Sequence, residues 1–154
     1  MQAGVGPMTG LVMVLLVAVS GATTKALAQA AQCSKGDFEA VVDEAAASLR
    51  DLTKQNTPQF QAKLRQLKDK RAWSNDQFMK EAEPFVRDDQ IAGFDQKSEE
   101  FLARITSGGQ AQSASAKPDC ALLLELRAAM KALVDTQRSK WSYMFDKLDK
   151  ELAR

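Results

Sequence analysis

Residues 88–99, DDQIAGFDQKSE, are the part of this sequence that comes nearest to a metal-binding pattern. A twelve-residue calcium loop has Asp first, Gly sixth and Glu twelfth, and Asp88, Gly93 and Glu99 stand at those places. The third and fifth positions of such a loop also supply oxygen ligands, but here they are Gln90 and Ala92. Because two ligands are weak or missing, the sequence predicts a helix boundary with solvated acidic side chains, without metal or cofactor.

Acidic residues are concentrated in the middle of the chain, where paired carboxylates would be able to do general acid–base chemistry. They are Glu81, Glu83, Asp88, Asp89, Asp95, Glu99 and Glu100. Such chemistry requires burial that separates the pKa values of the pair, and few apolar residues interrupt this stretch. The sequence has no histidine, so the commonest general base is absent. No Ser stands three places before a Lys either, and the sequence therefore favours a protein that is not an enzyme.

Arg127 and Gln137 are polar residues that helical periodicity places on the apolar side of the last predicted helix, residues 119–154. In one interpretation the Arg127 stem extends toward the end of the bundle, where its guanidinium meets a carboxylate. In the other, both residues line a polar pocket inside the bundle, as in all-helical enzymes that bind a small dianion. Secreted chorismate mutases have this architecture, but no residue-by-residue match accompanies the analogy. A small-molecule enzyme with an Arg-lined pocket is therefore the third possible function.

Cys33 and Cys120 are the only cysteines, and each stands beside the start of a predicted helix. In an oxidising compartment two such residues are expected to form one disulfide. A bond between them would close a loop of roughly 87 residues, which on the chain-entropy model stabilises the fold by about 4.5 kcal/mol at most. A redox-active role is less favoured, because catalytic pairs usually lie close together in sequence.

Residues 1–28 have the pattern of a secretory signal peptide. Residues 11–19, LVMVLLVAV, form an apolar run about half as long as a membrane crossing requires. Ala26, Leu27 and Ala28 then supply the small-x-small pattern of a cleavage site, although no Lys or Arg precedes residue 11. We expect an exported protein, periplasmic or extracellular, that begins near Gln29 and keeps no stable membrane anchor. The 21 basic and 20 acidic residues of the chain nearly cancel, which excludes a strong field for nucleic acid.

Helix signals predict an all-α domain over residues 29–154, a small bundle of about five helices with a long C-terminal helix. Ser34 precedes the first apolar stripe, so the first helix should cover about residues 35–55. Pro58 should end that helix and start the second. Ser74 and Gln77 form a capping box that begins the third.

Pro84 and Gly93 predict an interruption of the third helix, with a fourth helix resuming by Phe94. Residues 106–118, TSGGQAQSASAKP, contain no large apolar side chain and are predicted to be a flexible linker. If the disulfide joins the starts of the first and last helices at one end of the bundle, an even number of spans must separate them. Four helices before the last one satisfy this condition.

The last helix should bury Trp141, the largest side chain on its apolar face, and expose Tyr143 among Lys140, Lys147 and Lys150. This broad apolar face is wider than a two-stranded coiled-coil seam and suits the wall of a bundle.

A short segment of the chain resembles a known family motif. Residues 73–77, WSNDQ, are similar to the LTxxQ pentapeptide of small helical periplasmic chaperones, with Trp for Leu and Ser for Thr. Residues 52–56, LTKQN, are a second variant with Gln one place early. The same letters also describe a capping box preceded by an apolar residue. The resemblance implies a chaperone-like or stress-adapter protein of the periplasm.

The first expectation for function is a non-enzymatic, envelope-associated binding protein whose partner is another envelope protein or a peptide. The chaperone-like adapter is the second, and the small-molecule enzyme the third. An exposed apolar concave surface would favour the second, and a closed pocket lined by Arg127 the third. The sequence indicates no nucleic-acid partner and leaves the oligomeric state open.

Overall fold

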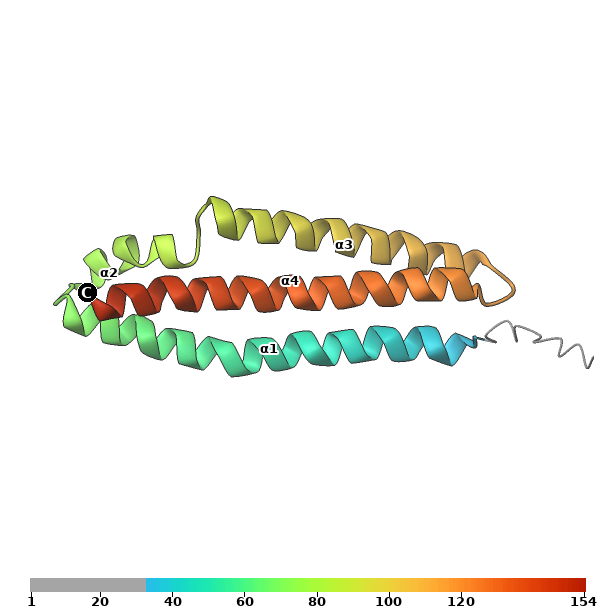
Figure 1. Cartoon of the computed structure of the whole chain (residues 1–154), viewed down its shortest axis with the longest axis horizontal. Coiled ribbons are helices and arrows are strands. Elements are labelled where there is room, and N and C mark those ends of the chain that lie inside the picture. Colours follow the sequence, from blue (N-terminus) through green and yellow to red (C-terminus); the bar gives the residue numbers. More distant parts are fainter. Residues whose placement is uncertain (1–32) are drawn as a thin grey trace, which may run out of the picture. The chain divides into compact units, whose positions relative to one another are not determined.

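The computed structural model describes residues 33–154, so the predicted signal peptide lies outside the described residues. These residues form helices and connections without strands, and the prediction of an all-α protein is confirmed. The elements are α1 (Lys35–Lys70), α2 (Asn75–Glu81), the short 3₁₀ helix η1 (Glu83–Phe85), α3 (Asp89–Ala114) and α4 (Cys120–Ala153), as Figure 1 shows.

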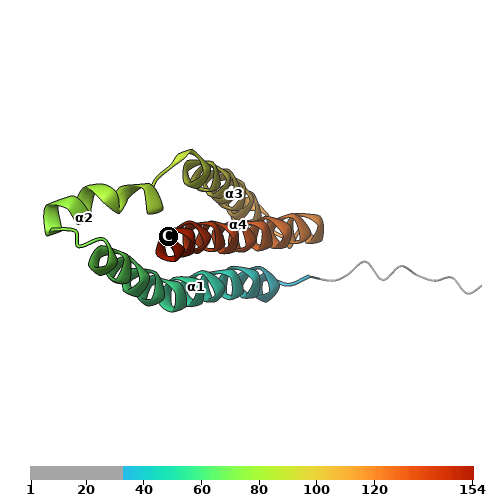
Figure 2. The same cartoon turned by 60° about the vertical axis from the view of Figure 1, so that its left-hand side comes forward.

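Helix α1 is longer than predicted because it continues through Pro58. Its start is the predicted one, since Ser34 Oγ accepts a hydrogen bond from the Asp37 N–H and the Asp37 carboxylate accepts one from the Ser34 N–H. An interior proline removes a helical hydrogen bond and costs about 3 kcal/mol. The burial of Phe60 and Leu67, 4% and 1% exposed, offsets this loss. The predicted boundary at Pro58 is therefore wrong, and the proline leaves only a bend in α1 (Figure 2).

The interruption predicted between Pro84 and Gly93 is confirmed. The capping box of Ser74 and Gln77 begins α2, and Pro84 lies in the first turn of η1. The next helix starts earlier than predicted, because the Asp88 carboxylate accepts a hydrogen bond from the Ile91 N–H at 2.8 Å and caps α3.

The flexible linker predicted for residues 106–118 is wrong for its first nine residues, which form the last turns of α3. Gly108 explains the difference, because it is buried where α3 crosses α4. A Cβ atom at Gly108 would lie 2.7 Å from Leu126 Cδ2, so glycine permits a close approach of the two helices. This contact stabilises a helical segment that its composition alone would leave loose. Only residues 115–119 connect α3 to α4.

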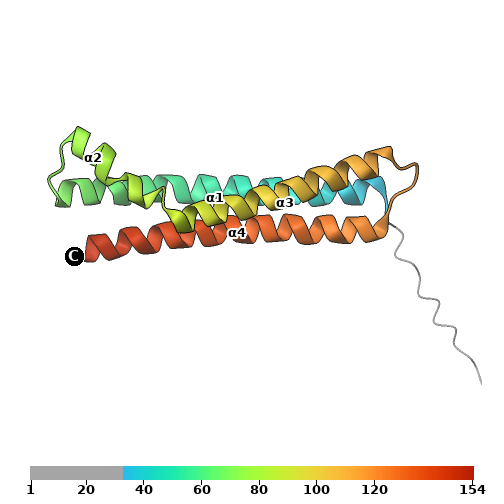
Figure 3. The same cartoon turned by 90° about the horizontal axis from the view of Figure 1, so that it is seen from above.

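Helices α1 and α3 each pack along α4 (Figures 1 and 3). The chain makes two passes before α4: α1 runs away from the disulfide end, and α2, η1 and α3 return to it. Cys33 and Cys120 are bonded to each other, with their Cα atoms 5.5 Å apart, as predicted. The even number of passes is thus confirmed, but the count of about five helices is wrong because α1 merges two predicted helices.

Two clusters of buried side chains hold the helices together. The proximal core, next to the disulfide, contains Phe38, Val41, Ala45, Leu123, Leu126, Met130 and Val134. The distal core contains Phe60, Leu67, Phe85, Ile91, Met144 and Leu148. Only the distal core includes a side chain from η1, which lies on the connection between α1 and α3.

Candidate functional site: an apolar trough between α1 and α3

A concave surface runs along the proximal part of α4, between α1 and α3. Both helices lie on the same side of α4 in Figure 3 and have little contact with each other. Two hollows of about 460 and 260 Å³ open along this surface, each lined by residues from all three helices. We call this surface the trough.

The walls of the trough are apolar and partly open to solvent. They are formed by Val42, Leu49 and Leu52 of α1 and by Leu102 and Ile105 of α3. Val42 is 47% exposed and Leu102 is 49% exposed, although both are large apolar side chains. Apolar side chains therefore line the trough on both sides without being covered by the rest of the described chain.

The floor of the trough belongs to α4. Met130 and Leu133 are buried beneath it, 7% and 4% exposed. Gln137 also lies here, and its Nε2 donates a hydrogen bond to Ser98 Oγ at 2.7 Å. Ser98 Oγ in turn donates to the Phe94 carbonyl at 2.9 Å. Gln137 thus joins α4 to α3, and its polar amide is already engaged within the fold.

Charged side chains line the trough only at its disulfide end. There Lys35, Glu39 and Lys117 border the larger hollow, and Lys35 Nζ lies 3.6 Å from Glu39 Oε1. The smaller hollow, farther along α4, has no charged residue in its lining. The trough therefore presents an uncharged apolar middle and a mixed, slightly positive end.

The trough ends where the distal core begins. Trp141 lines its last part and packs edge-on against Phe60, with ring centroids 6.0 Å apart. Trp141 is only partly buried, less than the sequence predicted, because one side of its ring borders the trough. Beyond it, Phe85 of η1 is 7% exposed and packs in the distal core, so the connection between α1 and α3 contributes a side chain there (Figure 2).

Arg127 does not lie in the trough or in either core. It is exposed on the other side of the α1–α4 contact, where it borders a shallow hollow of about 420 Å³ together with Glu44 and Asp135. Helix α4 turns Arg127 and Gln137 toward different neighbours, α1 and α3. Arg127 and Gln137 therefore border different hollows.

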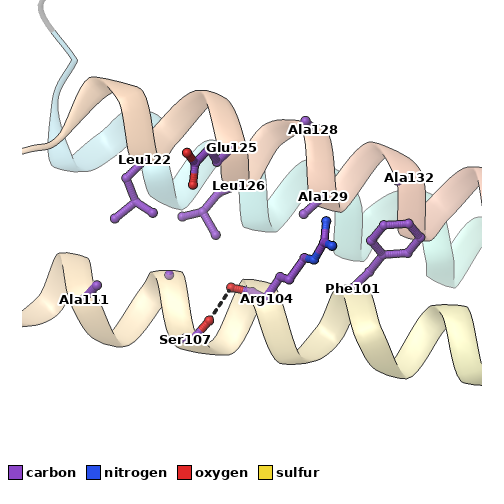
Figure 4. Close-up of a pocket in the computed structure, with 11 residues that line it drawn as sticks. Phe101, Arg104, Ser107, Ala111, Leu122, Glu125, Leu126, Ala128, Ala129 and Ala132 are labelled. Carbon is purple, nitrogen blue, oxygen red and sulfur yellow. Dashed lines mark hydrogen bonds between the residues drawn. The ribbon is translucent and has the colours of Figure 1, made fainter.

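A further groove follows the outer side of the α3–α4 contact (Figure 4). It measures about 730 Å³, and Arg104 and Glu125 extend from its two walls above small residues such as Ala129. Both charged side chains are on exposed residues, and the Ser107 hydroxyl donates to the Arg104 carbonyl within the helix. Nothing in this groove buries a reactive group.

One residue of the acidic stretch, Asp88, makes hydrogen bonds that stabilise the fold. Partial burial raises the pKa of this carboxyl, but hydrogen bonds from Lys147, the Ile91 N–H and the Tyr143 hydroxyl outweigh it and lower the pKa to about 2. Tyr143 was predicted to face solvent and is instead partly buried, with its hydroxyl 2.8 Å from Asp88 Oδ2. Residues 89–99 are helical, so this segment does not fold as a calcium-binding loop although its residue spacing resembles one. Within residues 33–154, no cluster of acidic or cysteine side chains is suited to hold a metal ion.

Comparison with known proteins does not relate this chain to a family. The chain matches no family model, no curated protein and no solved structure. Among the helices of residues 33–154, none combines the length and the apolar character that crossing a membrane demands.

Proposed function

We propose that this protein is an exported, non-enzymatic binding module that holds an apolar segment of an envelope protein in the trough between α1 and α3. The observation that carries the proposal is the pair of half-exposed apolar rims, Val42 and Leu102, on opposite walls of the trough. Exposed apolar surfaces of this kind are typical of sites where another protein binds.

Export is supported by two features that are independent of each other. The disulfide between Cys33 and Cys120 is typical of an oxidising compartment. The sequence of residues 1–28 has the pattern of a cleavable signal peptide. Intact-mass measurement of the protein from the cell envelope tests this part, and a mass that retains residues 1–28 would contradict it.

Site-specific photo-crosslinking in the producing cells tests binding through the trough. A benzophenone amino acid in place of Leu102 should crosslink a discrete envelope protein, because this side chain borders the trough. The matched control replaces Leu124, which is 64% exposed on α4 and lies outside the trough lining. Equal labelling from both positions, or no labelling from either, would reject the proposal.

A chaperone-like adapter is the second candidate, and the exposed concave apolar surface is the feature expected to favour it. The limited length of the trough, with Val42 and Leu102 on its opposite walls, supports a single partner instead. Such a protein would bind many unfolded chains rather than one partner, as the resemblance of residues 73–77 to LTxxQ implies. Light scattering of an aggregating, chemically denatured test protein separates the two functions. A chaperone would suppress the aggregation at near-equimolar ratio, and a module for one partner would not.

A further inference from the structure

In the distal half, the connection between α1 and α3 contributes a side chain to the core. There the connection from α1 to α3 runs through the short helices α2 and η1 (Figure 2). Phe85 of that segment packs with Phe60 of α1 and with Met144 of α4. The proximal half contains the same three long helices, but the described chain supplies no fourth segment there.

We infer that the trough receives one amphipathic helix of a partner protein, which completes a four-helix bundle in the proximal half. This inference rests on the proposed function and specifies the chemistry of the partner. A helix satisfies its own backbone hydrogen bonds. The polar side chains in the middle of the trough, Thr53, Ser98 and Gln137, already make hydrogen bonds within the fold, so they offer an incoming backbone few free partners. An extended strand would leave its N–H and C=O groups facing Leu49, Leu102 and Leu133.

The length of the trough sets the length of the partner helix. Its floor follows α4 from Leu123 to Trp141, which is roughly 27 Å at ~1.5 Å per residue. A helix of about 18 residues, or five turns, matches this distance. Its contact face requires apolar residues at spacings of three and four, because such residues form one stripe along a helix.

The charges around the trough define the rest of the partner. Since the middle of the trough lacks charged residues, the stripe that enters it must be uncharged as well. Lys35 and Lys117 outnumber Glu39 at the disulfide end, so an acidic residue of the partner is favoured at that end. A neutral apolar stripe with an acidic terminus is thus the expected recognition element.

A synthetic helix tests this inference on the mature protein. The probe is an 18-residue, Trp-free peptide with Leu along one face, Gln and Lys along the other, and Glu at one end. The control peptide has the same composition with its leucines distributed around the helix. Trp141 reports binding in a Trp73→Phe background, because Trp141 lines the trough whereas Trp73 packs in the distal core.

We expect the probe peptide to bind one to one, to shift the Trp141 emission to the blue and to gain helical circular dichroism. Leu102→Asp should weaken binding at least tenfold, and Val42→Asp should do the same from the opposite wall. Leu124→Asp is the matched control and should bind as the parent does. Melting curves of all three variants establish that they are folded, since each replaced side chain is about half exposed or more.

Three results would overturn the inference. The first is equal binding of both peptides, and the second is binding that Leu102→Asp and Val42→Asp leave unchanged. The third is a stable dimer, seen in sedimentation, in which the probe peptide does not change the Trp141 emission. In that case a second copy of this chain would occupy the trough. If Leu102 crosslinks an envelope protein in cells while the probe helix fails to bind, the helical occupant is wrong and the binding function stands. If neither experiment gives binding, both are wrong.

Discussion

The proximal and distal halves of this molecule share α1, α3 and α4 but are stabilised in different ways. The distal half buries aromatic and aliphatic side chains under η1 and is joined by ion pairs between helices. These pairs are Lys63–Asp149, Arg71–Glu151, Lys140–Asp95 and Lys147–Asp88. The proximal half has an open trough, and a covalent bond between Cys33 and Cys120 joins α1 to α4 there.

The disulfide therefore lies in the half of the molecule whose apolar walls remain partly exposed. A half with exposed apolar walls buries less surface on folding and gains less from the hydrophobic effect. The bond between Cys33 and Cys120 limits the freedom of the unfolded chain between these residues, which stabilises the fold without covering the trough. A concave apolar surface can therefore remain uncovered without separating the helices that form it.

The largest expected effect follows from removing the covalent bond. Replacing both Cys33 and Cys120 with Ala should lower the free energy of unfolding by up to about 4.5 kcal/mol, because the unfolded chain regains the freedom of a long loop. Hydrogen exchange should then show faster opening around Phe38 and Leu126 than around Leu67 and Leu148. Equal loss of protection in both halves would contradict the comparison.

The next effect concerns the distal core. Leu148 is 0% exposed, so Leu148→Ala should lower the free energy of unfolding by about 2–5 kcal/mol, through lost burial and the cavity that remains. Leu124→Ala on the same helix is the matched control and should change it by less than about 0.5 kcal/mol, because that side chain is 64% exposed. Urea denaturation measures both variants. Similar values for the two would mean that the distal half is not tightly packed.

A smaller effect tests the polar contact between α4 and the start of α3. Tyr143→Phe removes the hydroxyl that donates to Asp88 and should cost about 1–1.5 kcal/mol. Tyr143→Ala should cost more, since the ring also packs beside Phe94 with centroids 6.2 Å apart. Thermal unfolding compares the two variants. A Tyr143→Ala variant as stable as the parent would indicate that Tyr143 faces solvent, as the sequence predicted.

The smallest effect is the pH dependence due to Asp88. Its pKa is about 2 in the folded protein and 3.8 for the unperturbed group, so the unfolded chain binds the proton more tightly. The stabilisation is complete above about pH 4 and is lost as the pH falls toward about 2. We expect about 1 kcal/mol, less than the full shift implies, because the side chain is 25% exposed and solvent screens its contacts. Asp88→Asn should flatten this part of a stability profile, and an unchanged slope would assign it to other carboxylates.

Local signals predicted the ends of several elements correctly. Ser34 and Ser74 both cap helices as expected, and Pro84 interrupts the second pass. The cysteine count was enough to predict the disulfide, since the only two cysteines had no other partner to pair with in this sequence. These features depend on residues a few positions apart or on a simple count, and both can be read without the fold.

The errors arose where packing between distant residues outweighs local preference. Pro58 remains helical because α4 buries Phe60 and Leu67 on the next turns. Gly108 remains helical because α4 lies close to it, and no pattern in the sequence near residue 108 indicates that contact. Tyr143 was misplaced because α4 contacts neighbours on two sides, so more of its circumference is covered than one apolar stripe indicates.

The trough was not predicted from the sequence, because Val42 and Leu102 have the spacing of ordinary core residues. Periodicity identifies an apolar face but does not say whether another segment covers it. The available signal was the number of segments: the described chain has three long helices, and its one short helical segment contributes a side chain to the distal core alone. That number becomes visible only after α1 is known to continue through Pro58.

The disulfide also determines how this protein would respond to mechanical tension. If the chain is pulled from the residues before Cys33 and from Arg154, the force passes through the bond to Cys120 and into α4. Helices α1, α2 and α3 lie inside the closed loop and carry no load. Only the 34 residues of α4 can then lengthen, from about 51 Å as a helix to about 115 Å when extended. The floor of the trough would lengthen, while α1 and α3, which form its walls, would stay within the loop that the disulfide closes.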